Sequence, residues 1–343
     1  MNHAAAVFKT VTGICAICLL VGGTGCVASD KNTIAQASAF DTGLKPAQIQ
    51  GAQTNEYLQQ IGQRIIAAAK ELDKEKIGPR EHFKEGDNSW MFQDIRFQLV
   101  NSKTLNAFTT GGHFVYIYLE LFKMCKTEEE IAAVMANEYG HIYCRHVQKG
   151  SGRQQALALA SAGAGVAGKA AGVESSDSLV KALQAGGGFI DMGFTRKDEA
   201  QADQFGLKFY TRAGWDPAHF ADFFQAMIAA GYDKGSAMTS DHPTLASRVE
   251  ATKKDVSEQN PQRVAQYRKP PIADPKSFEN LKQQAIQVAQ GLPDDQKVLQ
   301  AKNLLQALPR SCWIPYEPDD QKQAQQAIVD QAQKQQAQQP KPQ

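Results

Sequence analysis

Three residues near the middle of the chain have the types and the spacing of a metal site. Asn137, Glu138 and His141 follow the order of the H-E-x-x-H pattern, with asparagine in place of the first histidine. In that pattern two histidines bind zinc, and the glutamate takes a proton from the attacking water. Positions 137 and 141 leave one face of a helix, so two ligands there can share an ion. The segment therefore predicts metal-assisted chemistry with one altered ligand.

A helix is expected to carry this segment. Thr127 can cap its start, and the three glutamates at 128–130 place negative charge at the positive end of the helix dipole. Apolar residues then recur at helical spacing, namely Ile131, Val134, Met135 and Ile142. The spacing predicts a helix whose apolar face enters a core.

Upstream elements are expected to support this helix. Residues 54–72 show the apolar period of a helix, and 95–100 and 113–118 alternate like strands. A turn with Gly111 and Gly112 lies between the two strands, so the simplest interpretation is a hairpin-like pair that leads into the motif helix. Downstream, helices are predicted over 195–213, after Thr244, near 276–290 and near 294–308.

Alanine and glycine dominate residues 151–190, and glycine at this density weakens helices. This composition predicts a pair of loosely packed helices that cover the site. A mobile lid or a membrane-touching segment is the alternative.

Several separate segments, taken in order, resemble one known family. They are Asn106-Ala107-Phe108, Gly111-Gly112, Arg145-His146, Thr195-Arg196-Lys197-Asp198-Glu199, Ala202-Asp203, Gly206, His242-Pro243 and Arg248. With the motif, they resemble the HtpX-like and BepA-like zinc metallopeptidases, peptidase family M48 of the gluzincin type. The resemblance covers roughly residues 55–255. It implies an α+β fold in which a mainly helical, zincin-like metallopeptidase domain with a small β-sheet occupies residues 51–256.

The same resemblance implies roles for the motif residues. One Zn²⁺ per chain would be held at position 137, by His141 and by Glu199, a glutamate on a later helix. Glu138 would be the catalytic general base. His146 is expected to be a structural histidine rather than a ligand.

Residues around the zinc also acquire roles from the resemblance. Asp203 would orient a ligand histidine, and Arg196 would hold a carboxylate in place. His242 is a candidate ligand that approaches the zinc, or else an ordinary histidine in a helix-capping turn. His113 and Val115 belong to the strand expected to pair with an extended peptide substrate, although a plain strand residue is the alternative for His113.

Asparagine at position 137 offers zinc only a neutral amide oxygen on a short side chain, whereas zinc prefers imidazole nitrogen, thiolate or carboxylate. His141 and Glu199 then remain, and two ligands rarely hold zinc tightly. Asp203 is expected to hydrogen-bond the Asn137 amide in place of an imidazole, which would keep the helix in register.

Three hypotheses follow from this substitution. The first is a zinc-dependent metalloendopeptidase of the bacterial cell envelope that acts on unfolded or misassembled proteins, is weakened by Asn137 and is completed by His242. The second is a pseudoprotease that keeps the cleft and acts as a peptide-binding chaperone or adaptor lipoprotein. The third is a structural lipoprotein that assembles through its C-terminal helices.

The N-terminus predicts export. Residues 1–25 contain one charged residue, Lys9, and an apolar run too short to span a bilayer, as in a signal peptide. The small residues before Cys26 resemble a lipoprotein cleavage site, so Cys26 is the predicted lipidation site; an ordinary signal peptide with an incidental cysteine is the alternative. Val27 follows the cysteine, so resemblance to Gram-negative lipoproteins implies the outer membrane, facing the periplasm.

The remaining segments complete the expected organisation. Residues 26–50 are predicted to be a tether, 257–320 a C-terminal helical region and 321–343 a Gln-rich, low-complexity tail. Without residues 1–25 the chain has 36 basic and 36 acidic residues, so its charge suggests no nucleic-acid partner.

Two cysteines are expected in the motif helix. Cys125 and Cys144 would lie roughly 25 Å apart along that helix and could not pair. Any internal disulfide would therefore include Cys312, and three buried free thiols are an equal alternative.

Overall fold

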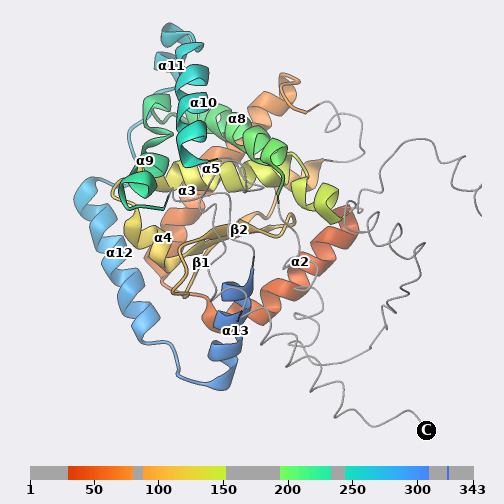
Figure 1. The fold of residues 1–343 in the computed structure, drawn as a ribbon, viewed down its shortest axis with the longest axis vertical. Helices are drawn as coiled ribbons and strands as arrows, with labels where there is room; N and C mark the ends of the chain where they lie inside the picture. Colours follow the sequence, from red (N-terminus) through yellow and green to blue (C-terminus); the bar gives the residue numbers. More distant parts are fainter. Residues whose placement is uncertain (1–29, 80–87, 152–193, 233–243, 309–322, 324–343) are drawn as a thin grey trace, which may run out of the picture.

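A computed structural model describes residues 30–79, 88–151, 194–232, 244–308 and Gln323. They form a mainly helical structure around one three-stranded sheet, which confirms the predicted α+β fold class (Figure 1). Several predictions fall outside these residues, namely those on the signal peptide, Cys26, all but the first residue of the Ala- and Gly-rich segment over 151–190, His242, Cys312 and most of the tail.

The strands are β1 (Arg96–Val100), β2 (Ala107–Thr109) and β3 (Phe114–Tyr118), in the spatial order β1-β3-β2. β1 runs parallel to β3, and β2 runs antiparallel to it. The predicted hairpin between the first and last of these strands is therefore wrong. The chain reverses twice between them and places β2 on the far side of β3, which lets β1 and β3 run in the same direction.

The central place of β3 also corrects the predicted substrate strand. Val115 of β3 is opposite Phe97 of β1 and Thr109 of β2, so both edges of this strand are already paired. An added peptide strand needs an unpaired edge. β2, which contacts the motif helix, is the edge strand on that side of the sheet.

Three long helices pack above the sheet: α3 (Ala52–Lys74), α5 (Glu128–Tyr143) and α8 (Arg196–Ala213) (Figure 1). Their positions confirm the helices predicted over 54–72, around the motif and over 195–213. Thr127 caps α5 as predicted, because its hydroxyl accepts a hydrogen bond from the Glu130 N–H. Cys125 precedes α5 and Cys144 follows it; both are buried and neither forms a disulfide within the described part of the chain.

The helices α5 and α8 touch through two reciprocal glycines. A Cβ atom on Gly140 would lie 2.8 Å from the carbonyl oxygen of Ala202, and one on Gly206 would lie 3.1 Å from the backbone of Asn137. Each helix therefore presents a residue without a side chain to the backbone of the other. This close approach brings the motif residues of α5 against the carboxylates of α8.

The predicted tether over 26–50 is wrong from Asp30 onward. Residues Asp30–Leu44 form the helix α2, followed by the 3₁₀ helix η1 (Lys45–Ala47). Thr33, Ala37, Phe40 and Leu44 are buried at helical spacing on one face of α2. The many small and polar residues between them hide this period in the sequence.

The two faces of the sheet enter two hydrophobic clusters. Val115 and Ile117 of β3 point into the larger cluster, which also contains the apolar residues of α3 and α5. Phe114, Tyr116 and Tyr118 point to the opposite face, where they meet α2 and α13. The sheet is therefore buried on both sides, and the N-terminal helix contributes to the second core.

The remaining helices enclose this centre. They are α4 (Leu119–Met124), α9 (Asp222–Ala229), α10 (Leu245–Ser257), α11 (Pro261–Tyr267), α12 (Pro275–Gln290) and α13 (Gln296–Ala307), with short 3₁₀ turns η2 (Ser89–Phe92) and η3 (Pro217–His219). α12 packs on α3 and α4, and α13 packs on α2 and η1, which confirms the two C-terminal helices predicted near 276–290 and 294–308 (Figure 1).

A buried carboxylate ties the C-terminal part of the chain to the motif helix. Glu128, in the first turn of α5, is 3% exposed and accepts hydrogen bonds from Tyr57 Oη, from Trp215 Nε1 and from the backbone N–H groups of Ile272 and Ala273. Charge-assisted bonds of this kind are strong. The segment between α11 and α12 is therefore fixed against the helix that carries the site.

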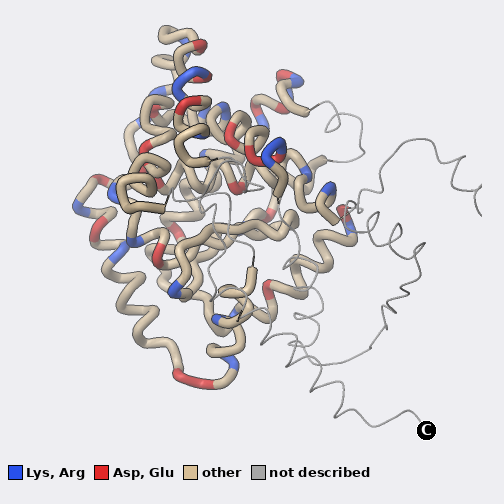
Figure 2. The backbone as a smooth tube through the Cα atoms, in the orientation of Figure 1, with Lys and Arg blue, Asp and Glu red and all other residues tan. Residues whose placement is uncertain are grey.

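Figure 2 shows acidic and basic residues interspersed along the outer helices. Among the described residues, every helix is too short or too polar to span a membrane.

We expect Gly140→Ala to destabilise the protein. The added Cβ meets a backbone carbonyl oxygen at 2.8 Å, and overpacking of this kind costs about 1–3 kcal/mol, which outweighs the roughly 1 kcal/mol that alanine gains in a helix. Urea denaturation measures the loss. Gly291→Ala is the matched control, because its nearest atoms lie at 3.6 Å and its φ is an ordinary −82°; equal stabilities of the two variants would contradict the close approach of α5 and α8.

Candidate active site

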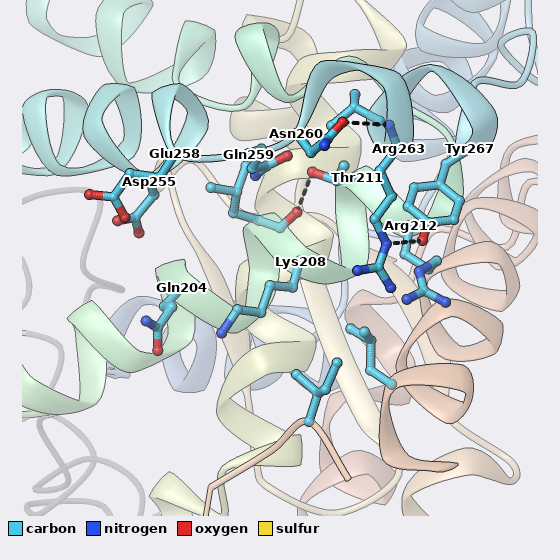
Figure 3. Close-up of a pocket in the computed structure, with 14 residues that line it drawn as sticks. Gln204, Lys208, Thr211, Arg212, Asp255, Glu258, Gln259, Asn260, Arg263 and Tyr267 are labelled. Carbon is cyan, nitrogen blue, oxygen red and sulfur yellow. Dashed lines mark hydrogen bonds between the residues drawn. The ribbon is translucent and has the colours of Figure 1, made fainter. Parts of the chain in front are cut away.

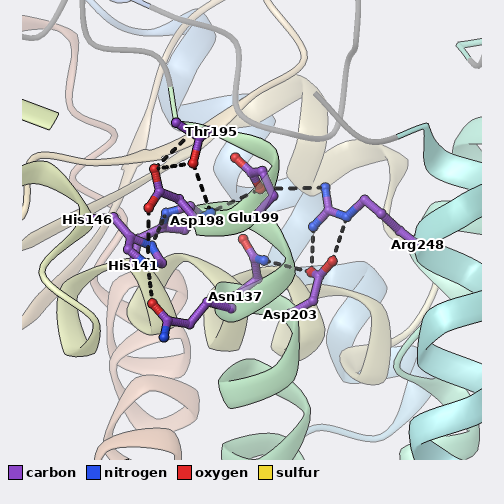
Figure 4. A network of polar contacts seen from close by, with 9 residues as sticks. Asn137, His141, His146, Thr195, Asp198, Glu199, Asp203 and Arg248 are labelled. Atoms are coloured by element: carbon purple, nitrogen blue, oxygen red, sulfur yellow. Dashed lines mark hydrogen bonds and ion pairs between the residues drawn. The ribbon is translucent and has the colours of Figure 1, made fainter. Parts of the chain in front are cut away.

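The crossing of α5 and α8 gathers the predicted site residues. Asn137, Glu138 and His141 come from α5, and Glu199 and Asp203 come from α8. Figure 4 shows four of them, Asn137, His141, Glu199 and Asp203. All except Asp203 are fully buried, and the Asp203 side chain is 14% exposed. The α5–α8 contact thus places five polar side chains in one enclosed region.

Two of these side chains are positioned to share a metal ion. His141 Nε2 lies 3.7 Å from Glu199 Oε2. Two donors bound at about 2.0–2.2 Å to one tetrahedral zinc would lie roughly 3.4 Å apart, so only a small closure separates this pair from a zinc-binding geometry. His141 Nε2 is also buried and has no hydrogen-bond partner among the residues that the structure describes.

The third donor does not fit zinc. Within the described ranges, His, Cys, Asp and Glu side chains form no group of three that could hold a metal. Asn137 occupies the place of the missing donor, and His242 lies outside the described residues. The described residues therefore include two of the side chains that were predicted to bind zinc, His141 and Glu199.

Asn137 makes the hydrogen bond that was expected of it. Its Nδ2 donates to Asp203 Oδ1 over 2.8 Å. Asp203 in turn accepts two hydrogen bonds from Arg248 of α10, from Nε to Oδ2 at 2.7 Å and from Nη2 to Oδ1 at 2.5 Å (Figure 4). A forked arginine–carboxylate pair fixes both position and orientation, so the Asn137 amide is held by an acceptor that cannot turn.

Arg248 forms ion pairs with two carboxylates of α8, Asp203 and Glu199. Its Nη1 lies 3.9 Å from Glu199 Oε2, and its guanidinium stacks over the Phe224 ring at 4.3 Å. Burial raises the pKa of Asp203, and the charge of Arg248 opposes that rise. The sequence singled out Arg248 as part of a motif without giving it this role, because no local pattern links α10 to α8.

Arg196, the residue predicted to hold a carboxylate, is exposed in the first turn of α8. The structure shows Arg248 in such a role, and the role of Arg196 stays a prediction. His113 is half-buried before β3, where its Nδ1 lies 3.1 Å from the Gln93 carbonyl oxygen and its ring packs edge-on against Trp90. These contacts connect His113 to the chain before β1.

A second histidine lies directly behind His141. The Nδ1 atoms of His141 and His146 are 3.0 Å apart, and His146 Nε2 lies 2.9 Å from Gln201 Oε1. Burial and the neighbouring His141 lower the pKa of His146 to about 3, so its ring is neutral. Burial opposes protonation of His141, but Glu199 and the nearby carboxylates outweigh it and raise the pKa of His141. Sequence reasoning missed Gln201, because a lone glutamine on a helix carries no signal.

Two hollows lie along α8. A cavity of about 390 Å³ between α3, α8 and α11, lined by Lys208, Arg212 and Tyr267 among others, contains none of the predicted site residues (Figure 3). A groove of about 520 Å³ between α8 and α10 reaches Asp203 and Arg248. The groove, and not the cavity, borders the site.

We expect Arg248→Leu to destabilise the protein by about 3–5 kcal/mol at neutral pH, because it leaves the Asp203 carboxylate buried without its counter-charge. The folded pKa of Asp203 would then lie further above its unfolded value of about 3.9. The variant is therefore most stable below the pKa that Asp203 has in the unfolded state. It loses stability as the pH rises through the pKa that Asp203 has in the folded state. Urea denaturation at acidic and neutral pH measures this difference.

Arg248→Lys is the matched control, since it keeps the positive charge and loses the forked geometry. Two outcomes would contradict the idea that Arg248 stabilises an ionised Asp203. The loss of unfolding free energy in Arg248→Leu could fail to become smaller at acidic pH, or Arg248→Lys could lose as much stability as Arg248→Leu.

Comparison with known proteins agrees with this geometry. The model of peptidase family M48 matches residues 52–256, close to the predicted 51–256. The beta-barrel assembly-enhancing protease of Yersinia pestis is 30% identical over 183 residues, which cover 49% of this chain and 35% of that protein. Metalloprotease LoiP of Escherichia coli (strain K12) is 28% identical over 161 residues, which cover 46% of this chain and 61% of that protein.

The mitochondrial metalloendopeptidase OMA1 of Schizosaccharomyces pombe is 30% identical over 160 residues, which cover 46% of this chain and 45% of that protein. The chain thus spans between about a third and three fifths of the length of these relatives. The family match covers more than half of the chain and all of the elements that build the site: the chain belongs to peptidase family M48.

Proposed function

We propose that the chain is a zinc-dependent metalloendopeptidase of the bacterial cell envelope whose activity is weakened by Asn137. The observation that carries this proposal is the approach of His141 Nε2 to Glu199 Oε2 at 3.7 Å, beside Glu138. The family supports peptidase chemistry, and the names of the bacterial relatives support the envelope.

His141 and Glu199 would hold the zinc, which when bound supplies a Lewis acid for the scissile carbonyl and the attacking water. Glu138, next to position 137 on α5, would be the general base, which would take a proton from the attacking water and return it to the leaving amine. Asp203 and Arg248 keep α8 oriented, so that Glu199 stays opposite His141. With two ligands in place of three, the protein holds zinc weakly.

The substrate is an extended polypeptide, as expected of unfolded or misassembled proteins. A peptide bound near this site would pair with β2, whose outer edge has no strand neighbour in the described sheet. β2 also contacts α5, so a peptide on that edge lies beside the helix that carries Glu138.

A pseudoprotease is the second candidate, and one observation favours it. The hydrogen bond from Asn137 to Asp203 satisfies the buried carboxylate without any metal. Asp203 and Asn137 therefore satisfy each other without a metal ion, and a metal-free protein could still bind peptides as a chaperone or adaptor. The third hypothesis, assembly through the C-terminal helices, is weaker because α12 and α13 already pack on the protein's own core.

We also propose that Cys26 carries a lipid that anchors the protein to the outer membrane. Asp30, four residues later, is fixed to the motif region, because its carboxylate pairs with Arg145 at 3.0 Å and accepts hydrogen bonds from Trp90 and Gln148. Four residues reach at most about 14 Å. A lipid on Cys26 would therefore hold the C-terminal end of α5 close to the bilayer.

Mass spectrometry of the protein purified from membranes tests the anchor. We expect a mature chain that starts at Cys26 and carries acyl groups, and we expect Cys26→Ser to leave the protein unprocessed and without lipid. An unmodified N-terminus at another residue would contradict the proposal.

We expect Asn137→His to raise the zinc affinity at least tenfold, or about 1.4 kcal/mol, because it adds a first ligand to a site already built around His141 and Glu199. Competition with a chelator of known affinity gives the change, and metal analysis gives the stoichiometry. Cleavage of casein should appear or increase in parallel.

Glu138→Gln in the Asn137→His background is the matched control. It removes the base and leaves the ligands, so it should abolish cleavage while zinc stays bound. If Asn137→His gains neither zinc nor activity, the endopeptidase proposal fails, and capture of unfolded peptides by the metal-free protein then tests the pseudoprotease.

A further inference from the structure

We propose that His146 and Gln201 are positioning residues that fix His141 in one tautomer, with its proton on Nδ1 and its lone pair on Nε2, the atom that faces Glu199. This inference deepens the proposed function, because only a lone pair on Nε2 can bind a metal there. The tautomer itself is a property of the metal-free protein, so it can be tested whether or not zinc binds.

The direction of the hydrogen bonds follows from the atoms around His146. Its Nε2 lies 2.9 Å from Gln201 Oε1 and 3.8 Å from Asp198 Oδ1. The amide oxygen of Gln201 can only accept a hydrogen bond, and at 2.9 Å it is the nearer of the two partners. His146 Nε2 therefore carries the hydrogen and donates it to Gln201.

The rest of the chain of hydrogen bonds is then determined. A neutral imidazole has one N–H, so His146 Nδ1 is an acceptor. The contact of 3.0 Å between the two Nδ1 atoms requires a donor, which must be His141. His141 Nδ1 thus carries its hydrogen, and in the neutral ring Nε2 is left with a lone pair directed at Glu199, 3.7 Å away.

The backbone brings His146 to this position. α5 ends at Tyr143, Cys144 caps it, and Arg145 then adopts the left-handed conformation with φ 55°. This turn folds the chain back, so His146 lies against His141 in an edge-on arrangement with ring centres 4.9 Å apart. The salt bridge between Arg145 and Asp30 stabilises a conformation that a residue with a side chain rarely adopts.

The two rings have little room to move. His141 and His146 are both 0% exposed. Phe194 stacks on His141 with ring centres 3.9 Å apart and an angle of 29° between the planes. A ring held on its face by Phe194 and at Nδ1 by His146 presents Nε2 in one direction. The site thus has separate supports: Asp203 and Arg248 for position 137, and His146 and Gln201 for position 141.

Nitrogen-15 chemical shifts of the histidine rings test the tautomer directly. They would be measured on the chelator-treated, metal-free protein over a range of pH that extends above the raised pKa of His141. We expect a protonated Nδ1 and an unprotonated Nε2 for His141, and the reverse for His146. A wild-type His141 with its proton on Nε2 would overturn the proposal without the need for any variant.

Variants separate positioning from packing. His146→Leu removes the acceptor and should let His141 populate the other tautomer, whereas His146→Asn keeps an acceptor oxygen near Nδ1 and should restore the wild-type shifts. Gln201→Leu supplies a second test if His146→Leu does not fold, because it removes the acceptor of His146. A His141 tautomer unchanged in both leucine variants would overturn the proposal.

Metal affinity gives a further readout in the Asn137→His background. There His146→Leu should bind zinc 10–100-fold more weakly and His146→Asn should not, which is the range that residues orienting a ligand usually contribute. If no zinc binds at all, the endopeptidase proposal fails while the ring shifts still decide the tautomer. If zinc affinity is the same in all three proteins, the positioning role fails.

Discussion

The contact on which the rest of the site depends is the one between α5 and α8 at Gly140 and Gly206. Each glycine lies against the backbone of the other helix, Gly140 at Ala202 and Gly206 at Asn137. Because these two contacts fix both the distance and the register of the helices, Glu199 falls beside His141 and Asp203 falls beside position 137. A helix pair that had to accommodate two more Cβ atoms would separate both pairs at once.

This close packing encloses charged side chains, and their compensation connects the site to distant parts of the chain. A buried carboxylate destabilises a protein unless it is paired and hydrogen-bonded. Arg248 of α10 compensates Asp203 and lies near Glu199, while N–H and O–H donors from three other segments surround Glu128 at the start of α5. The positions of α10 and of the segment before α12 are therefore set by carboxylates of α5 and α8, as well as by apolar burial.

Local patterns predicted the local features. The Thr127 cap and the helices α3, α5 and α8 follow from apolar period and capping residues, which act within a few positions. Strand direction was predicted wrongly, because the alternation of apolar and polar residues along a strand does not depend on whether its neighbour is parallel or antiparallel. Contacts between elements, such as Arg248 with Asp203 or His146 with Gln201, were not predicted, since nothing in one segment specifies which distant side chain it will meet. The Asn137–Asp203 bond was predicted because the family resemblance had already placed the two helices together.

The asparagine at position 137 is held by contacts with protein groups alone. The backbone at 137 is fixed by Gly206, and the first polar atom of its side chain is fixed by Asp203. Both constraints act on the part of the side chain that asparagine shares with histidine. What asparagine lacks is the outer part of the imidazole ring, with the second ring nitrogen that could bind a metal. Asparagine at this position therefore keeps a hydrogen bond between α5 and α8, so the architecture of the family can persist without a histidine at position 137.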